Sequence, residues 1–172
     1  MQVLYGIAGG IAAYKAPEVV RGLRRAGHEV RCVLTANAVR LVAVEALVAV
    51  SGQAVATTMW RGDGSMPHIE LARWGEALLI APATADLLAR CALGLADDLL
   101  TTLFVALEPG RPVIFAPAMN TVMWEKPIVQ AHVRSLRSAG AKIIEPVAGD
   151  LACGEQGVGA MVAPEALVAA LA

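Results

Sequence analysis

Asn120 follows a short apolar run, Pro112 to Ala116, which is typical of a buried parallel strand. Ligands in open α/β sheets bind beyond the carboxyl ends of the strands, so Asn120 is a candidate binding residue. Its amide offers two donor hydrogens and an acceptor oxygen. Asn is also a common cap of a following helix, and position alone favours neither role.

Two further side chains could transfer protons. His68 stands at the start of a short helical pattern, and its near-neutral pKa would suit acid–base chemistry, although a structural role is the commoner one for a lone histidine. Cys153 lies in a glycine-rich segment, where we expect a proton donor or redox-active thiol carried over a site by loop closure. Cys32 and Cys91 fall in an expected strand and helix, and we expect both to be buried as small hydrophobes.

Small or polar residues also follow three other expected strands. Such loops expose backbone amides that bind phosphate, and they meet at one edge of a parallel sheet, so together they predict one phosphorylated cofactor. A glycine pair is weak evidence alone, because tight packing of a strand against a helix also explains it. The three groups are Gly9, Gly10 and Ile11; Thr35 and Asn37; and Thr84, Ala85 and Asp86.

Strand-like runs alternate with helical patterns along the chain. This alternation predicts an α/β fold with a doubly wound, Rossmann-like (flavodoxin-like) parallel sheet in a single domain over residues 1–172. We expect the first helix to run from near Gly10 to Gly27, and residues 147–163 to form an irregular, mobile flap. The expected strands are Gln2 to Ile7, Glu29 to Leu34, Ala77 to Ile80, Pro112 to Ala116 and Lys142 to Ile144.

The composition limits which kinds of binding partner we expect for this protein. The net charge is −1 with both signs interspersed, which gives no footprint for nucleic acid or an anionic membrane. No apolar run approaches the roughly 20 residues that span a bilayer, and no targeting segment is evident, so we expect a cytoplasmic protein. The hydrophobic fraction of 57% suggests apolar subunit contacts. Three cysteines without paired spacing argue against a disulfide framework and a metal site.

Five motifs together resemble the homo-oligomeric FMN-containing cysteine decarboxylases, and most closely the branch that acts on phosphopantothenoylcysteine. The motifs are GGIAAYK at 9–15, HIELARW at 68–74, APATAD at 81–86, PAMNTVMW at 117–124 and ACG at 152–154. The resemblance implies that FMN is held by the three groups of loop residues above together with Ala118. It further implies that His68 is the active-site base, that Asn120 holds the substrate carboxylate, that Met123 lines the same pocket, and that Cys153 lies on a substrate-clamping flap.

The implied reaction oxidises the cysteine moiety to a thioaldehyde, releases CO2 to give an enethiol and, with help from Cys153, reduces that enethiol. The product from 4′-phosphopantothenoylcysteine would be 4′-phosphopantetheine, in coenzyme A biosynthesis. The resemblance also implies a homotrimer or dodecamer and a possible separate phosphopantothenate–cysteine ligase. Two positions differ from many bacterial relatives, since Gly10 replaces a serine and Ala160 an arginine. The alternatives are a peptidyl-cysteine decarboxylase acting on a C-terminal Cys and a non-catalytic FMN-binding regulatory subunit.

Overall fold

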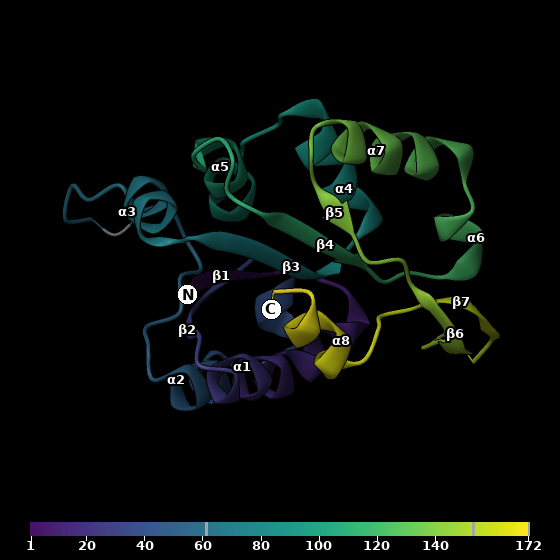
Figure 1. The fold of residues 1–172 in the computed structure, drawn as a ribbon, viewed down its shortest axis with the longest axis horizontal. Helices are drawn as coiled ribbons and strands as arrows, with labels where there is room; N and C mark the ends of the chain where they lie inside the picture. Colours follow the sequence, from purple (N-terminus) through teal and green to yellow (C-terminus); the bar gives the residue numbers. More distant parts are fainter. Residues whose placement is uncertain (61, 153, 172) are drawn as a thin grey trace.

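The computed structural model describes residues 1–60, 62–152 and 154–171. Strands and helices alternate along most of the chain (Figure 1). In chain order the elements are β1 (Gln2–Ile7), the 3-10 helix η1 (Ile11–Lys15), α1 (Ala16–Arg25), β2 (Glu29–Leu34), the 3-10 helix η2 (Ala38–Arg40), α2 (Val44–Ser51), α3 (Pro67–Trp74), β3 (Ala77–Ala83), α4 (Ala85–Leu93), α5 (Leu99–Ala106), β4 (Val113–Pro117), α6 (Thr121–Trp124), α7 (Pro127–Ser138), β5 (Lys142–Ile143), β6 (Val147–Asp150), β7 (Gln156–Ala160) and α8 (Pro164–Ala169).

Five parallel strands form one sheet in the order β2-β1-β3-β4-β5. The chain moves outward from β1 in one direction and then in the other, so the order reverses between β1 and β3, and a crevice is expected at that switch point. The predicted doubly wound α/β fold is therefore confirmed. All five predicted strands are present, and β3 continues to Ala83 rather than stopping at Ile80.

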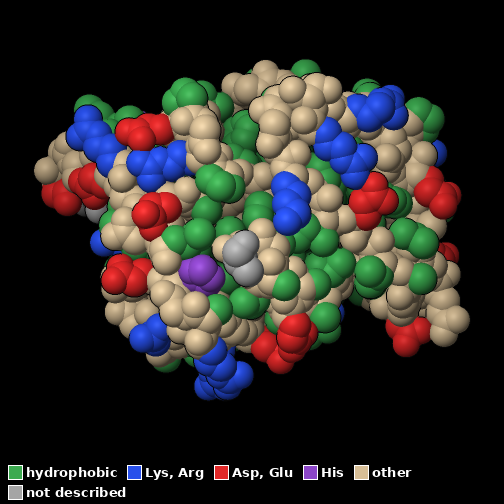
Figure 2. Space-filling view, in the orientation of Figure 1, with side chains coloured by type: hydrophobic (Ala, Val, Ile, Leu, Met, Phe, Trp, Pro, Cys, Tyr) green, Lys and Arg blue, Asp and Glu red, His purple; other side chains and the backbone are tan. Residues whose placement is uncertain are grey.

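Helices cover both faces of the sheet. Figure 1 shows α1, α2 and α8 on one face and α4, α5 and α7 on the other. Apolar side chains of the central strands point alternately into two clusters, one beneath each helical layer, and α3 packs beside α5 in the second. On the surface drawn in Figure 2, acidic and basic side chains are interspersed. No helix of the described residues has the length and apolar character to cross a bilayer.

The helix predicted from Gly10 to Gly27 is divided. Residues 11–15 form η1, and the α-helix begins only at Ala16. Pro17 explains the break, because proline has no amide hydrogen and is tolerated in the first turn of an α-helix but not in its interior. The expected end at Gly27 agrees with the structure, since this glycine has a φ of +85° just after α1.

The segment predicted to be irregular, residues 147–163, contains an antiparallel hairpin, so the prediction of irregular backbone was wrong. β6 pairs with β7 from Val147 opposite Ala160 to Asp150 opposite Gln156. The hairpin lies apart from the large sheet and next to α6 (Figure 1). Its glycines serve close packing: a Cβ on Gly159 would lie 2.1 Å from the Met119 carbonyl oxygen. Mobility of this flap remains a prediction.

Candidate functional site

A cavity of about 600 Å³ lies beyond the carboxyl ends of β1, β3 and β4. Its walls are the turn into η1, the start of α4, the loop from β4 into α6, and the β6–β7 hairpin. The structure brings together eight residues that the sequence singled out: Gly9, Gly10, Ile11, Thr84, Ala85, Ala118, Asn120 and Met123. The loops after β1, β3 and β4 therefore converge in one chain, whereas the predicted loop after β2 does not line the cavity.

The glycine turn after β1 offers backbone rather than side chains to the cavity. Gly9 packs so closely on Asn37 that an added Cβ would lie 2.3 Å from the Asn37 Cβ. No side chain of the described residues caps the first turn of η1, which begins at Ile11. Amide groups at such an uncapped helix start suit an anion.

Three predicted cofactor residues lie outside the cavity lining. Thr35 accepts a weak hydrogen bond from the Ala38 amide at 3.4 Å, and Asn37 packs behind Gly9. The Asp86 side chain is 78% exposed and pairs with Arg90, one turn along α4, at 3.6 Å. These positions support the loops around the cavity, and a direct contact with a cofactor stays a prediction for each.

Asn120 uses both ends of its amide. Its Oδ1 accepts a hydrogen bond from the Val122 amide at 2.8 Å, so the capping role considered for this residue is real. Its Nδ2 donates at 2.8 Å to Oε2 of Glu155, which lies in the turn between β6 and β7. The oxygen is committed to α6, and the amide therefore presents its donor group, the one that suits a carboxylate, to the hairpin side of the loop.

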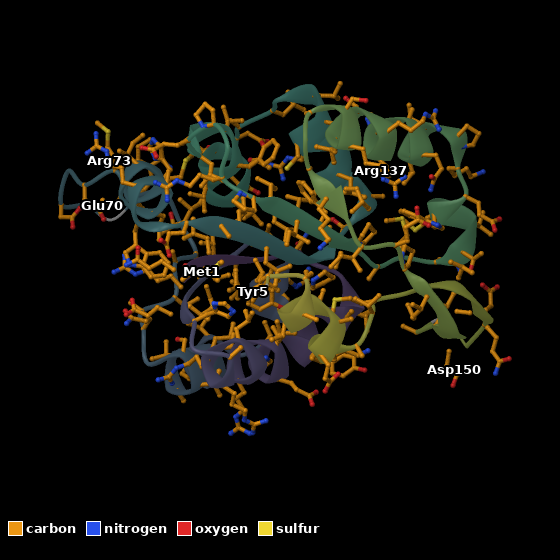
Figure 3. The ribbon with its side chains drawn as sticks, viewed as in Figure 1. Met1, Tyr5, Glu70, Arg73, Arg137 and Asp150 are labelled. Atoms are coloured by element: carbon orange, nitrogen blue, oxygen red, sulfur yellow. The ribbon has the colours of Figure 1, made fainter. Side chains whose placement is uncertain are left out.

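His68 is not brought to the cavity within one chain. It is the second residue of α3, whose Leu71 and Ala72 are buried. Figure 3 labels Glu70 and Arg73 of the same helix at one end of the molecule and Asp150, a lining residue, at the other. The His68 Nδ1 atom is buried and has no hydrogen-bond partner among the described residues.

Of the three cysteines, Cys153 lies outside the described residues, but its chain neighbours Leu151 and Ala152 line the cavity. The other two are buried, as expected. Burial raises the pKa of Cys32, and of Cys91, to about 12, so both remain neutral thiols. Among the described residues, no three His, Cys, Asp or Glu side chains gather where they could bind one metal ion.

Sequence reasoning missed several lining residues, of which Tyr14 and Lys15 matter most. Lys15 is the one cationic side chain among the described residues of the lining, and Asp150 is the one anionic side chain there. Tyr14 and Lys15 were expected on an unbroken helix that begins near Gly10. Had Pro17 been taken as the first turn of that helix, both residues would have been predicted to lie before the helix, in the turn that follows the glycine pair.

Comparisons with known proteins agree with this architecture. The model of the flavoprotein family matches residues 1–172. The chain is 44% identical over 171 residues to the coenzyme A biosynthesis bifunctional protein CoaBC of Haemophilus influenzae, and 46% identical over 165 residues to that of Mycobacterium tuberculosis. These alignments cover 98% and 96% of this chain but only 42% and 38% of the relatives, so the chain spans about two fifths of their length.

The similar solved structures include two that superpose over nearly the whole chain. A Cys-to-Ser mutant of PPC decarboxylase, complexed with pantothenoylaminoethenethiol, superposes with a TM-score of 0.90 at 33% identity, covering 99% of this chain and 95% of that one. The FMN-dependent cysteine decarboxylase SpaF gives a TM-score of 0.82 at 35% identity, covering 100% and 98%. With the family model matched from end to end, the chain belongs to the flavoprotein family.

Proposed function

We propose that this chain binds FMN in the cavity and decarboxylates 4′-phosphopantothenoylcysteine to 4′-phosphopantetheine, a step of coenzyme A biosynthesis. The observation that carries the proposal is the meeting of Asn120 and Met123 with the glycine turn in one cavity beside the hairpin. The similarity to CoaBC proteins and to PPC decarboxylase supports the choice of substrate. The proposed role also fits a cytoplasmic location and a separate ligase as partner.

The residues present fit FMN. The cavity volume of about 600 Å³ lies in the usual range for cofactor pockets. Gly9, Gly10 and Ile11 would hold the phosphate through backbone amides, and Lys15, which lines the same cavity, would add a positive charge. Thr84, Ala85 and Ala118 are small enough to leave room for a flat ring. When bound, FMN supplies the electron sink and the hydride carrier.

Asn120 suits a carboxylate that must leave as neutral CO2. A guanidinium would stabilise the charged ground state more strongly than a neutral amide does, and so would raise the barrier to its loss. An amide donor orients the group without that penalty. Met123 adds an apolar wall, which disfavours charge and therefore favours the uncharged product.

His68 would act as the base from a second copy of the chain. It does not line the cavity of its own chain, and Glu70 and Arg73 of the same helix lie at the opposite end of the molecule from Asp150 of the cavity (Figure 3). Large apolar side chains are exposed in both regions: Trp60 is 82% and Met66 62% exposed before α3, and Ile11 is 58% and Tyr14 63% exposed at the cavity. Contact between copies would bury both sets. We propose a homotrimer, or a dodecamer built from trimers, with each cavity completed by a neighbour.

Cys153 would protonate the enethiol while it is reduced. Its chain neighbours Leu151 and Ala152 line the cavity, which supports this role for Cys153. For Cys153→Ser we expect the decarboxylated but unsaturated product to accumulate, as measured by mass spectrometry. Normal yield of the saturated thiol would remove Cys153 from the reaction.

A peptide ending in Cys is the second candidate substrate, because the FMN-dependent cysteine decarboxylase SpaF is 35% identical to this chain and PPC decarboxylase 33%, although the TM-score of SpaF is lower, 0.82 against 0.90. The two candidate substrates can be distinguished by incubating the FMN-loaded chain anaerobically with 4′-phosphopantothenoylcysteine or with such a peptide. The products are then identified by mass spectrometry. We expect loss of CO2 from the first and no change in the second. Reaction of the peptide alone, with loss of CO2 and two hydrogens, would overturn the proposed substrate.

A further inference from the structure

The contact between Asn120 and Glu155 joins the candidate carboxylate-binding residue to the tip of the hairpin. The two residues are 35 positions apart, and the distance from Asn120 Nδ2 to Glu155 Oε2 is 2.8 Å. The contact therefore links the loop to the hairpin directly, through an exposed Glu155 side chain.

The loop around Asn120 is held on two sides. On one side, Oδ1 accepts from the Val122 amide at 2.8 Å and begins α6. On the other, the Met119 amide donates to the Gly159 carbonyl at 3.0 Å, which fixes the loop backbone against β7. Glu155 completes the arrangement, because this acceptor on the hairpin holds the donor end of the amide.

From these contacts we infer that Glu155 is a positioning residue, which fixes the Asn120 amide so that its nitrogen, and not its oxygen, faces the substrate carboxylate. The inference rests on the proposed decarboxylase function and adds a residue to it. An amide nitrogen carries two hydrogens and can serve two acceptors. A rotated amide would place its oxygen beside Glu155, an arrangement of two acceptors that the carboxylate excludes.

Three variants separate the possible roles of Glu155. Glu155→Ala removes the acceptor. Glu155→Gln keeps an acceptor oxygen without the charge. Gln156→Ala is the matched control, because it removes a neighbouring side chain of the hairpin whose amide donates to Asp150 Oδ1 at 3.0 Å.

Two ligands that cannot react isolate the carboxylate. We would titrate FMN-loaded protein with 4′-phosphopantothenoylserine and with 4′-phosphopantothenoylethanolamine, which differ only by that group, and follow the flavin absorbance. Glu155→Ala should weaken binding of the serine compound about tenfold and leave the ethanolamine compound within twofold. Glu155→Gln should restore most of the loss, and Gln156→Ala should match the unchanged protein.

Three results would overturn the inference. Equal losses for both ligands would make Glu155 a support of the hairpin. Tighter binding of the serine compound by Glu155→Ala would make Glu155 a competitor for the amide. No change would make the contact irrelevant. Turnover of 4′-phosphopantothenoylcysteine by the unchanged protein, measured in parallel, tests the proposed function separately, and its absence would leave the two-ligand comparison valid for Glu155.

Discussion

Replacing Gly159 by alanine should release the hairpin from the Asn120 loop. The added Cβ would lie 2.1 Å from the Met119 carbonyl oxygen and 3.3 Å from the Leu151 side chain. The first neighbour is backbone and cannot rotate away. The strand must therefore shift by about 1 Å to reach an ordinary contact distance. That shift would break the hydrogen bond from the Met119 amide to the Gly159 carbonyl, now 3.0 Å long.

Gly159→Ala should destabilise the docking of the hairpin on the Asn120 loop, and not the packing of the core. A backbone hydrogen bond contributes about 0.5–1.5 kcal/mol net, and forced overpacking costs about 1–3 kcal/mol, so docking should weaken by about 1.5–4.5 kcal/mol. Every 1.4 kcal/mol is tenfold, which gives roughly tenfold faster opening at the lower end. The global free energy of unfolding should change little, because β6 and β7 lie outside the five-stranded sheet.

Hydrogen exchange of the Met119 amide measures this effect directly. Gly149→Ala is the matched control, since it adds the same methyl group to β6, where the nearest atom is the Ala160 Cβ at 3.3 Å. We expect at least roughly tenfold faster exchange in Gly159→Ala, little change in Gly149→Ala, and turnover reduced about tenfold in the first. Equal exchange rates in the two variants would refute the idea that Gly159 docks the hairpin.

Three further predictions concern the cofactor, the second copy and pH. Gly9→Ala, whose Cβ would lie 2.3 Å from that of Asn37, should lower the flavin content of purified protein, and full content would show that the turn adapts. His68→Asn and Asn120→Ala should each keep flavin but lose turnover. Mixing the two variants should restore part of the turnover, because hybrid oligomers pair an intact His68 with an intact Asn120. No recovery would mean that both residues of one site come from the same chain. Burial raises the pKa of Cys32 from 9.0 to about 12, so the native state holds this proton more tightly. The free energy of unfolding should therefore fall as pH rises from 9 to 12, and urea unfolding should show a shallower fall for Cys32→Ala; an identical slope would contradict the burial effect.

The sheet could be predicted from the sequence because its signals are local. Short apolar runs between helical patterns locate all five strands, and the residues that follow them locate the cavity edge. The hairpin could not be found this way, because β6 and β7 are specified by glycines such as Gly159 that fit against the distant Met119 backbone. Its glycine-rich composition was therefore mistaken for irregular structure.

The candidate site was predictable to the extent that it is made by strand ends. Gly9, Gly10 and Asn120 were identified because each directly follows a strand. Lys15 was missed because its place in the cavity depends on the break between η1 and α1. The position of His68 was not predictable, since its motif gives a helix but not the distance from that helix to the cavity.

Release of labelled CO2 tests the central claim most directly. FMN-loaded protein and its Asn120→Ala variant would be incubated anaerobically with 4′-phosphopantothenoylcysteine labelled at the cysteine carboxyl carbon. If the cavity performs the proposed reaction, the unchanged protein releases label, and the variant keeps its flavin but releases at least roughly tenfold less, the loss expected from one ligand-binding donor. Equal release by both proteins, or none from flavin-loaded unchanged protein, would contradict the account.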